Sequence, residues 1–99
     1  MTTWREMITE HMAKHGDSLA DVVSMCAETN NWKDENRKPY KDDSWLDLDF
    51  DAGYGGEEGA RFTIWTTDRI YFPACYDGSE WCTSVARNPN GKPTGHVGG

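Results

Sequence analysis

Four carboxylates stand at regular spacing in the middle of the chain, and carboxylate oxygens are ligands that calcium prefers. Counted from Asp47, they occupy positions 1, 3, 5 and 12, as in the calcium loop of an EF-hand. These residues are Asp47, Asp49, Asp51 and Glu58. However, Ala52 stands where the loop needs glycine, and the acids alternate with Leu48 and Phe50 in the manner of a half-buried strand. We therefore favour a strand with outward aspartates and keep a calcium site as the alternative.

The whole formal charge of the chain lies in segment 42–58. The 99 residues include 17 acids and 10 bases, a net charge of -7, and this segment has seven acids and no Lys or Arg. The seven are Asp42, Asp43, Asp47, Asp49, Asp51, Glu57 and Glu58. Alternate residues of a strand are about 6.6 Å apart, comparable to the separation of successive phosphates in a nucleic acid. We expect a nucleic-acid mimic that binds a basic protein surface and no nucleic acid directly. The alternative is an edge strand whose charges prevent aggregation.

Two histidines have the spacing of paired zinc ligands on one helix face. His11 and His15 are separated by four residues, and Cys26, His96 or a carboxylate could add a third ligand. No CxxC or CxxxH pattern supports such a site. We favour a helix stripe that becomes polar toward its C-terminal end, where histidine complements the helix dipole. We expect no metal or other cofactor, with zinc kept as an alternative.

The cysteines are candidate nucleophiles. A predicted two-residue turn at 77–78 places Cys75 and Cys82 on one face but diagonally, about 7–8 Å apart, which is too far for a disulfide. Neither cysteine has a neighbour that would activate a thiolate. We expect free thiols and no enzymatic activity.

The composition favours a cytoplasmic location. No apolar run approaches the ~20 residues of a membrane helix. The first helical segment carries Glu6 and Glu10 where a secretory signal would be uninterrupted and apolar. The hydrophobic fraction of 36% and the aromatic fraction of 12% indicate a folded core. We expect a folded protein of the cytoplasm, without a membrane partner.

Hydrophobic periodicity predicts an α+β fold in which an N-terminal antiparallel helix pair packs on a sheet of three or four strands. The first helix begins with Thr3 and Glu6 at capping-box spacing and ends at Gly16. The second is capped by Asp17 or Ser18. The predicted single domain, 1–99, comprises a helical pair at 1–28, a polar loop at 29–44, an antiparallel β-meander at 45–87 and an extended tail at 88–99.

The meander has two apolar faces. Besides the acidic strand at 45–51, strands are predicted at 62–66, 69–76 and 79–87, with two-residue turns between the last three. One face carries Thr63, Trp65, Ile70, Phe72, Ala74, Trp81, Thr83 and Val85, and the other carries Phe62, Ile64, Tyr71, Pro73, Cys75, Cys82 and Ser84. We expect the Trp65 face to lie under the helices. Tyr54, Phe62 and Tyr71 would then anchor the partner beside the carboxylates.

The C-terminal part of the chain resembles a group of small uncharacterised proteins of bacteriophages and mobile elements. The resemblance rests on Ile64-Trp65-Thr66, Tyr71-Phe72-Pro73, the run from Tyr76 to Trp81, and Gly98-Gly99. Short acidic accessory proteins of phages are often stoichiometric inhibitors of host defence. The resemblance therefore implies an anti-defence protein that occupies the nucleic-acid groove of a host complex, such as a CRISPR effector.

Overall fold

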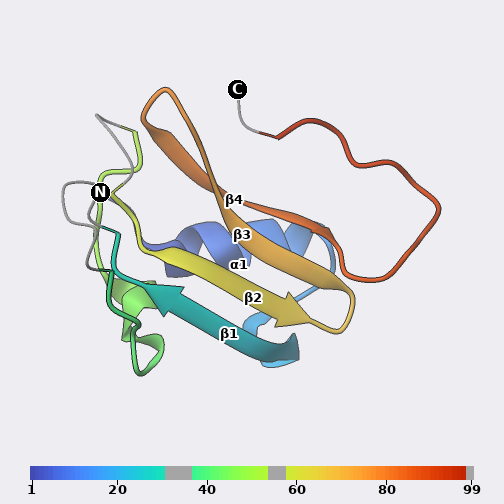
Figure 1. Ribbon diagram of the computed structural model, residues 1–99, viewed down its shortest axis with the longest axis horizontal. Coiled ribbons are helices and arrows are strands. Elements are labelled where there is room, and N and C mark those ends of the chain that lie inside the picture. The colour runs from blue at the N-terminus through green and yellow to red at the C-terminus, as the bar shows by residue number, and fades with distance from the viewer. Residues whose placement is uncertain (31–36, 54–57, 98–99) are drawn as a thin grey trace.

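A computed structural model describes residues 1–30, 37–53 and 58–97 (Figure 1). Its elements are α1 (Trp4–Lys14), the 3-10 helix η1 (Leu19–Asp21), β1 (Val22–Glu28), the 3-10 helix η2 (Asp43–Asp47), β2 (Arg61–Thr66), β3 (Arg69–Tyr76) and β4 (Ser79–Ala86). The strands form one antiparallel sheet in the order β1-β2-β3-β4. The prediction of one helical layer on an antiparallel sheet is confirmed in this coarse form. Within the described residues, no helix is long and apolar enough to span a membrane.

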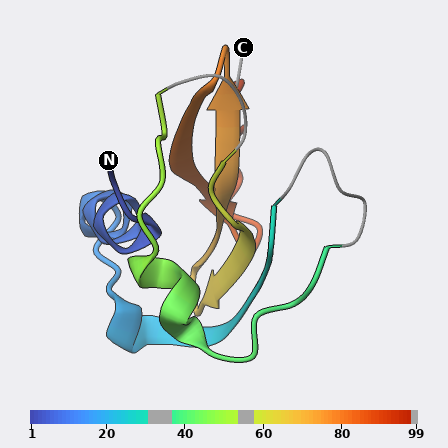
Figure 2. The same cartoon turned by 90° about the vertical axis from the view of Figure 1, so that its left-hand side faces the viewer.

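The helical layer covers one face of the sheet only. Seen from the side, α1 and η2 lie on the same side of the strands (Figure 2). Thr3 caps α1 by accepting a hydrogen bond from the Glu6 amide, and Gly16 follows the helix with a φ of 74°. Trp4, Ile8 and Met12 form the buried stripe of α1. These features confirm the first predicted helix.

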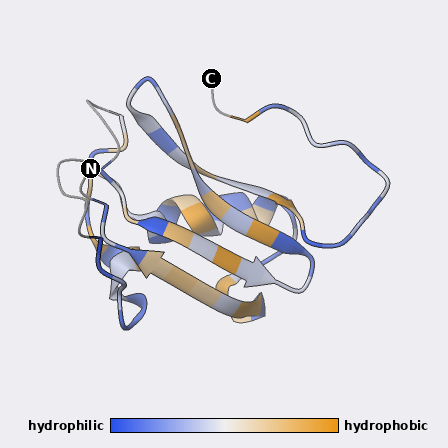
Figure 3. Cartoon of the chain, viewed as in Figure 1, coloured by the Kyte–Doolittle hydropathy of each residue, from blue (hydrophilic) through white to orange (hydrophobic). Residues whose placement is uncertain are grey.

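The second predicted helix is wrong. Ser18 does form a capping box with Asp21, but the helix that it begins is only the one-turn η1. The chain then extends as β1, whose residues pair with β2 from Val22↔Thr66 to Glu28↔Arg61. β-branched residues such as Val22 and Val23 favour strands, and the pairing with β2 outweighs the helical spacing of the apolar residues. β1 is apolar along most of its length (Figure 3).

The two predicted hairpins are confirmed. β2, β3 and β4 are joined by two-residue turns, and Asp77 and Gly78 have φ values of 52° and 82°. Positive φ at both positions is the requirement of a type I′ turn, whose twist matches that of the strands. The register pairs Pro73 with Cys82, as the short turn predicts. All three cysteines are free.

The predicted acidic strand is also wrong. Asp42 accepts a hydrogen bond from the Ser44 amide and begins η2, whose two neighbouring residues Trp45 and Leu46 are both buried. A strand cannot bury two consecutive side chains against one layer, because they point in opposite directions. After η2 the chain runs extended, and Phe50 forms an isolated bridge with Thr2. The fourth strand of the sheet is therefore β1 and not the acidic segment 45–51.

The covered face of the sheet is the one that the sequence pattern assigned to the outside. Phe62, Ile64 and Tyr71 belong to the hydrophobic core, whereas Trp65 and Phe72 are half-buried on the opposite face. Both faces are apolar, so alternation alone could not decide between them. What decides is the docking of α1 and η2, which supply the tryptophans that pack on Phe62.

Candidate protein-binding surface

Carboxylates of the acidic segment are exposed along η2 and the stretch that follows it. We use the term acidic side for the exposed residues Asp42, Asp43, Asp49, Asp51 and Glu58. Because η2 lies beside α1, this part of the chain is on the helical side of the sheet (Figure 2). Glu57 and Tyr54, also predicted to contact a partner, lie outside the described residues. The carboxylates follow a 3-10 turn and an irregular stretch, so the evenly spaced ladder predicted from a strand does not form.

One predicted partner-binding acid has an internal role. Asp47 accepts hydrogen bonds from Arg5 on α1 through both carboxylate oxygens, at 2.6 and 3.0 Å. The hydrogen bonds from Arg5 hold the pKa of Asp47 below its usual range. Two hydrogen bonds from Ser44 do the same for the pKa of Asp42, which caps η2. Both side chains are therefore ionised at neutral pH, but Asp47 ties η2 to α1.

Neither metal site proposed from spacing is assembled. The Asp51 amide donates a hydrogen bond to a Glu58 carboxylate oxygen at 3.4 Å. The His11 and His15 rings lie 4.9 Å apart, centroid to centroid. Over residues 1–30, 37–53 and 58–97, no three His, Cys, Asp or Glu side chains are grouped so as to hold a metal ion. The structure gives no support to the calcium or zinc alternative.

The aromatic residues predicted to anchor a partner are core residues. Phe62 is 4% exposed and Tyr71 is 0% exposed, so neither side chain is accessible on the surface. Among the described residues, Trp65, Phe72 and Trp81 are aromatic residues that are only half-buried on the uncovered side of the sheet. We use the term open face for the half-buried residues Trp65, Ile70, Phe72, Trp81 and Val85. The open face and the acidic side lie on opposite sides of the sheet.

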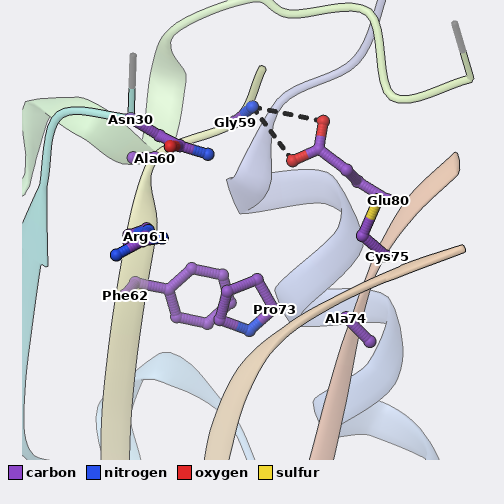
Figure 4. A pocket seen from close by; sticks show the side chains of 9 residues that line it. All are labelled: Asn30, Gly59, Ala60, Arg61, Phe62, Pro73, Ala74, Cys75 and Glu80. Carbon is purple, nitrogen blue, oxygen red and sulfur yellow. Dashed lines mark hydrogen bonds between the residues drawn. The ribbon is translucent and has the colours of Figure 1, made fainter. Parts of the chain in front are cut away.

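A cleft of about 290 Å³ lies between the first residues of β2 and the last residues of β3 (Figure 4). The two strands pair only at Ile64↔Tyr71 and Trp65↔Ile70, and Pro73 has no N–H with which to continue the ladder. Phe62 on β2 and Pro73 on β3 both line the cleft (Figure 4). The volume is at the lower limit of ligand pockets, which begin at about 300 Å³.

The carboxylate of Glu80 lies at one end of this cleft and binds the backbone just before β2. Glu80, 6% exposed, accepts hydrogen bonds from the amides of Glu58 and Gly59 at 2.8 to 3.2 Å. These bonds fix the chain as it enters β2, and a buried carboxylate needs such donors. The cleft is thus explained by the irregular pairing at Pro73 and by this anchor, without a ligand.

The strongest constellation that spacing did not reveal is a polar seam between the end of α1 and the sheet, formed by His11, Asp17, Thr66, Arg69, Tyr71 and Ser84. Asp17 accepts hydrogen bonds from the Tyr71 hydroxyl at 2.5 Å and from Thr66 at 3.0 Å. Burial and the carboxylate of Asp17 raise the pKa of Tyr71, which therefore remains protonated. Ser84 lies 2.9 Å from His11 Nε2 and accepts from Arg69 Nε at 2.9 Å.

The Ser84–His11 contact has the length of a nucleophile–base pair, but its setting is structural. Ser84 is 7% exposed beneath α1, and Arg69 donates to its oxygen. Burial lowers the pKa of His11, which favours the neutral ring, and the tautomer of that ring sets whether Nε2 accepts the Ser84 hydrogen or donates to the Ser84 oxygen. Burial also raises the pKa of the Cys82 thiol to about 12. That thiol is protonated at neutral pH and is not an activated nucleophile.

The seam involves residues that are up to 73 positions apart in the chain, as for His11 and Ser84. The only sequence signal for it is the presence of polar residues, such as Thr66 and Ser84, on a face that is otherwise apolar. Comparison with known family models, curated proteins and solved structures finds no match to this chain.

Proposed function

We propose that this protein acts by stoichiometric binding to a basic surface of another protein, through its acidic side. The single observation that carries the proposal is that the five carboxylates of the acidic side are all exposed, four of them between residues 42 and 51. Among the described residues, Asp47 is the one acid of segment 42–58 that has an ion-pair partner. The exposed acids are therefore available to Lys and Arg side chains of a partner.

A nucleic-acid-binding groove is the kind of basic surface that fits best. Such a groove presents clustered Lys and Arg to phosphates. The net charge of -7 disfavours direct binding of nucleic acid to this protein. Together with the resemblance of the C-terminal part to phage proteins, this supports an anti-defence inhibitor, with a CRISPR-type effector as the host target. Binding would exclude the nucleic acid of the host complex from its groove.

A variant in which three carboxylates of the acidic side are replaced by neutral amides tests the proposal. Asp43, Asp49 and Asp51 are changed together to Asn, which retains the side-chain oxygen that Asp51 offers to the Gly53 amide. The partner is captured from a bacterial lysate that contains the defence complex, identified by mass spectrometry and purified. We expect the triple variant to bind it at least about tenfold more weakly, and wild-type binding to weaken with added salt.

The matched control removes the same charge elsewhere. Asp21, Asp68 and Asp77 are exposed and lie outside the acidic side, and their triple change to Asn also takes the net charge from -7 to -4. The control should bind like the wild type. Equal loss in both variants would indicate a general charge effect, and unchanged affinity in the first would refute the acidic side as the binding surface. Competition between the protein and a nucleic acid for the purified partner then tests the mimicry.

A further inference from the structure

The extended tail after β4 begins with two asparagines that differ in the residue that follows them (Figure 1). Asn88 precedes Pro89. Asn90 precedes Gly91. Both asparagines are exposed and lie outside the strands. The backbone nitrogen of the next residue can attack an asparagine side chain only where that nitrogen carries a hydrogen. Proline has none, so this reaction is open to Asn90 and closed to Asn88.

The side chain of Asn90 is folded back onto its own backbone. Its Oδ1 accepts a hydrogen bond from the Lys92 amide at 2.9 Å, which is the pattern of an Asx turn. The ring that this bond closes contains the Asn90 Cγ and the Gly91 nitrogen, the two atoms that would have to join. The Lys92 amide is also directed at the oxygen on which negative charge develops when Cγ is attacked. A donor in that position stabilises the developing charge.

Gly91 leaves the approach to this Cγ atom unobstructed. Its φ is 72°, in the left-handed region that glycine adopts without steric cost. A Cβ atom at this position would have nothing within 4 Å, so no neighbouring element crowds the residue. Among the described residues, none accepts a hydrogen bond from the Gly91 amide. Its hydrogen is therefore accessible to a base from solvent.

We propose that Asn90 is a site of spontaneous deamidation, assisted by the Lys92 amide. Hydroxide removes the Gly91 amide hydrogen, and the nitrogen forms a bond to Asn90 Cγ. The Cγ–Nδ2 bond then breaks, and the leaving nitrogen takes a proton from water and departs as ammonia, which regenerates hydroxide and leaves a succinimide ring. Water opens the ring at one of its two carbonyls and yields aspartate or isoaspartate. No electron is transferred, and water is the one co-reactant consumed.

The product places a new carboxylate at a defined point of the surface. Asn90 lines a cleft of about 300 Å³ together with His15, Asp68 and Arg69. Deamidation adds one further negative charge to the net charge of -7. Isoaspartate also lengthens the backbone by a methylene group where the tail leaves the sheet. The site is separate from the acidic side, so the proposal stands whether or not that surface binds a partner.

The test incubates the full-length protein at mildly alkaline pH and follows the more acidic product by anion-exchange chromatography. Peptide mapping by mass spectrometry should locate the amide-to-carboxylate mass gain at Asn90, with no gain at Asn88 as the internal control. In the native protein the reaction should be about fivefold faster than in the chain unfolded by guanidinium chloride, the net contribution of about one hydrogen bond. An unmodified Asn90, or an equal or faster reaction in the unfolded chain, would overturn the proposal.

Two substitutions of Lys92 separate the backbone donor from the side-chain charge. Lys92→Pro removes the N–H that donates to Asn90 Oδ1 and should slow deamidation about fivefold. Lys92→Ala keeps this N–H and removes the exposed charge, so its rate should stay within about twofold of the wild type. Equal rates in the two variants would refute the assistance by the Lys92 amide.

Gly91→Ala tests the attack by the backbone nitrogen. The added methyl group does not fit the left-handed conformation and stands beside the attacking atom, so the reaction should slow by at least about tenfold. A rate equal to that of the wild type would assign the loss of the amide to direct hydrolysis by water and would overturn the proposal. Because Gly91 is exposed and outside the strands, the variant should keep the melting temperature of the wild type.

Discussion

The two faces of the sheet are built from similar residues but have different roles. One face carries Phe62, Ile64 and Tyr71, which are at most 4% exposed beneath the helical layer. The other carries Trp65 and Phe72, which are only half-buried on the open face. Both faces are therefore suited to packing, and one helix with a 3-10 turn covers only one of them. The comparison teaches that apolar residues on a strand identify a face that packs well, and that the docked elements decide which face becomes the core.

The largest expected difference between the faces is in their contribution to stability. Trp4 is 1% exposed, packs on Phe50 and Phe62, and donates its indole hydrogen to the Ala60 carbonyl at 3.0 Å. Trp4→Ala should lower the free energy of unfolding by about 3–5 kcal/mol, measured by denaturant titration. Trp65→Ala on the open face should cost only about 1–2 kcal/mol. Equal losses would mean that the open face is as well packed as the core.

Gly59 tests how tightly the covered face is packed. A Cβ at this position would lie 2.7 Å from Trp4 Nε1 and 2.8 Å from a Phe50 ring carbon. Gly59→Ala should therefore destabilise the protein by about 1–3 kcal/mol through overpacking. Gly95→Ala is the control, since nothing lies within 4 Å of its added methyl group, and its effect should stay within about 0.5 kcal/mol. A neutral Gly59→Ala would show that Trp4 can move.

The polar seam gives the covered face a dependence on pH that the open face lacks. Burial, with repulsion from His15, Lys14 and Arg69, lowers the pKa of His11 below its ordinary value of 6.5. The unfolded chain then binds the proton more readily than the folded protein. The free energy of unfolding should therefore fall as the pH drops below 6.5. The effect should be smaller than those of the two preceding substitutions.

Stability measured at two pH values in wild type and in His11→Gln checks this dependence. Glutamine keeps a group that can bond to Ser84 but does not titrate, so the decline between neutral pH and about pH 5 should be shallower in the variant. His15, which is exposed, should contribute less, and His15→Gln serves as the comparison. Identical pH profiles for wild type and His11→Gln would remove His11 as the source.

The elements that could be predicted from sequence are those held by local chemistry. The Thr3 cap, the stripe of α1 and the Asp77-Gly78 turn each depend on residues a few positions apart. The strands at 61–66, 69–76 and 79–86 follow, because short turns set their register.

The elements that were predicted wrongly, β1 and η2, depend on contacts with residues far away in the chain. β1 is a strand because β2 offers it an edge, although its apolar spacing also fits a helix. η2 is helical because Trp45 and Leu46 both enter the core, which the alternation of Asp47, Asp49 and Asp51 concealed. The acidic residues could be identified as a group from charge alone. Their arrangement could not, because it follows from η2.

The long connection between β1 and β2 has a kinetic consequence. β2, β3 and β4 are linked by two-residue turns, so their contacts form between near neighbours in the chain. β1 must instead close residues 29–60 into a loop before it can pair, and such closure is slow relative to hairpin formation. We expect β1 to join last during folding. Until it does, β2 has an unsatisfied edge that is a template for aggregation, and the rate at which Val22–Glu28 docks sets how long that hazard lasts.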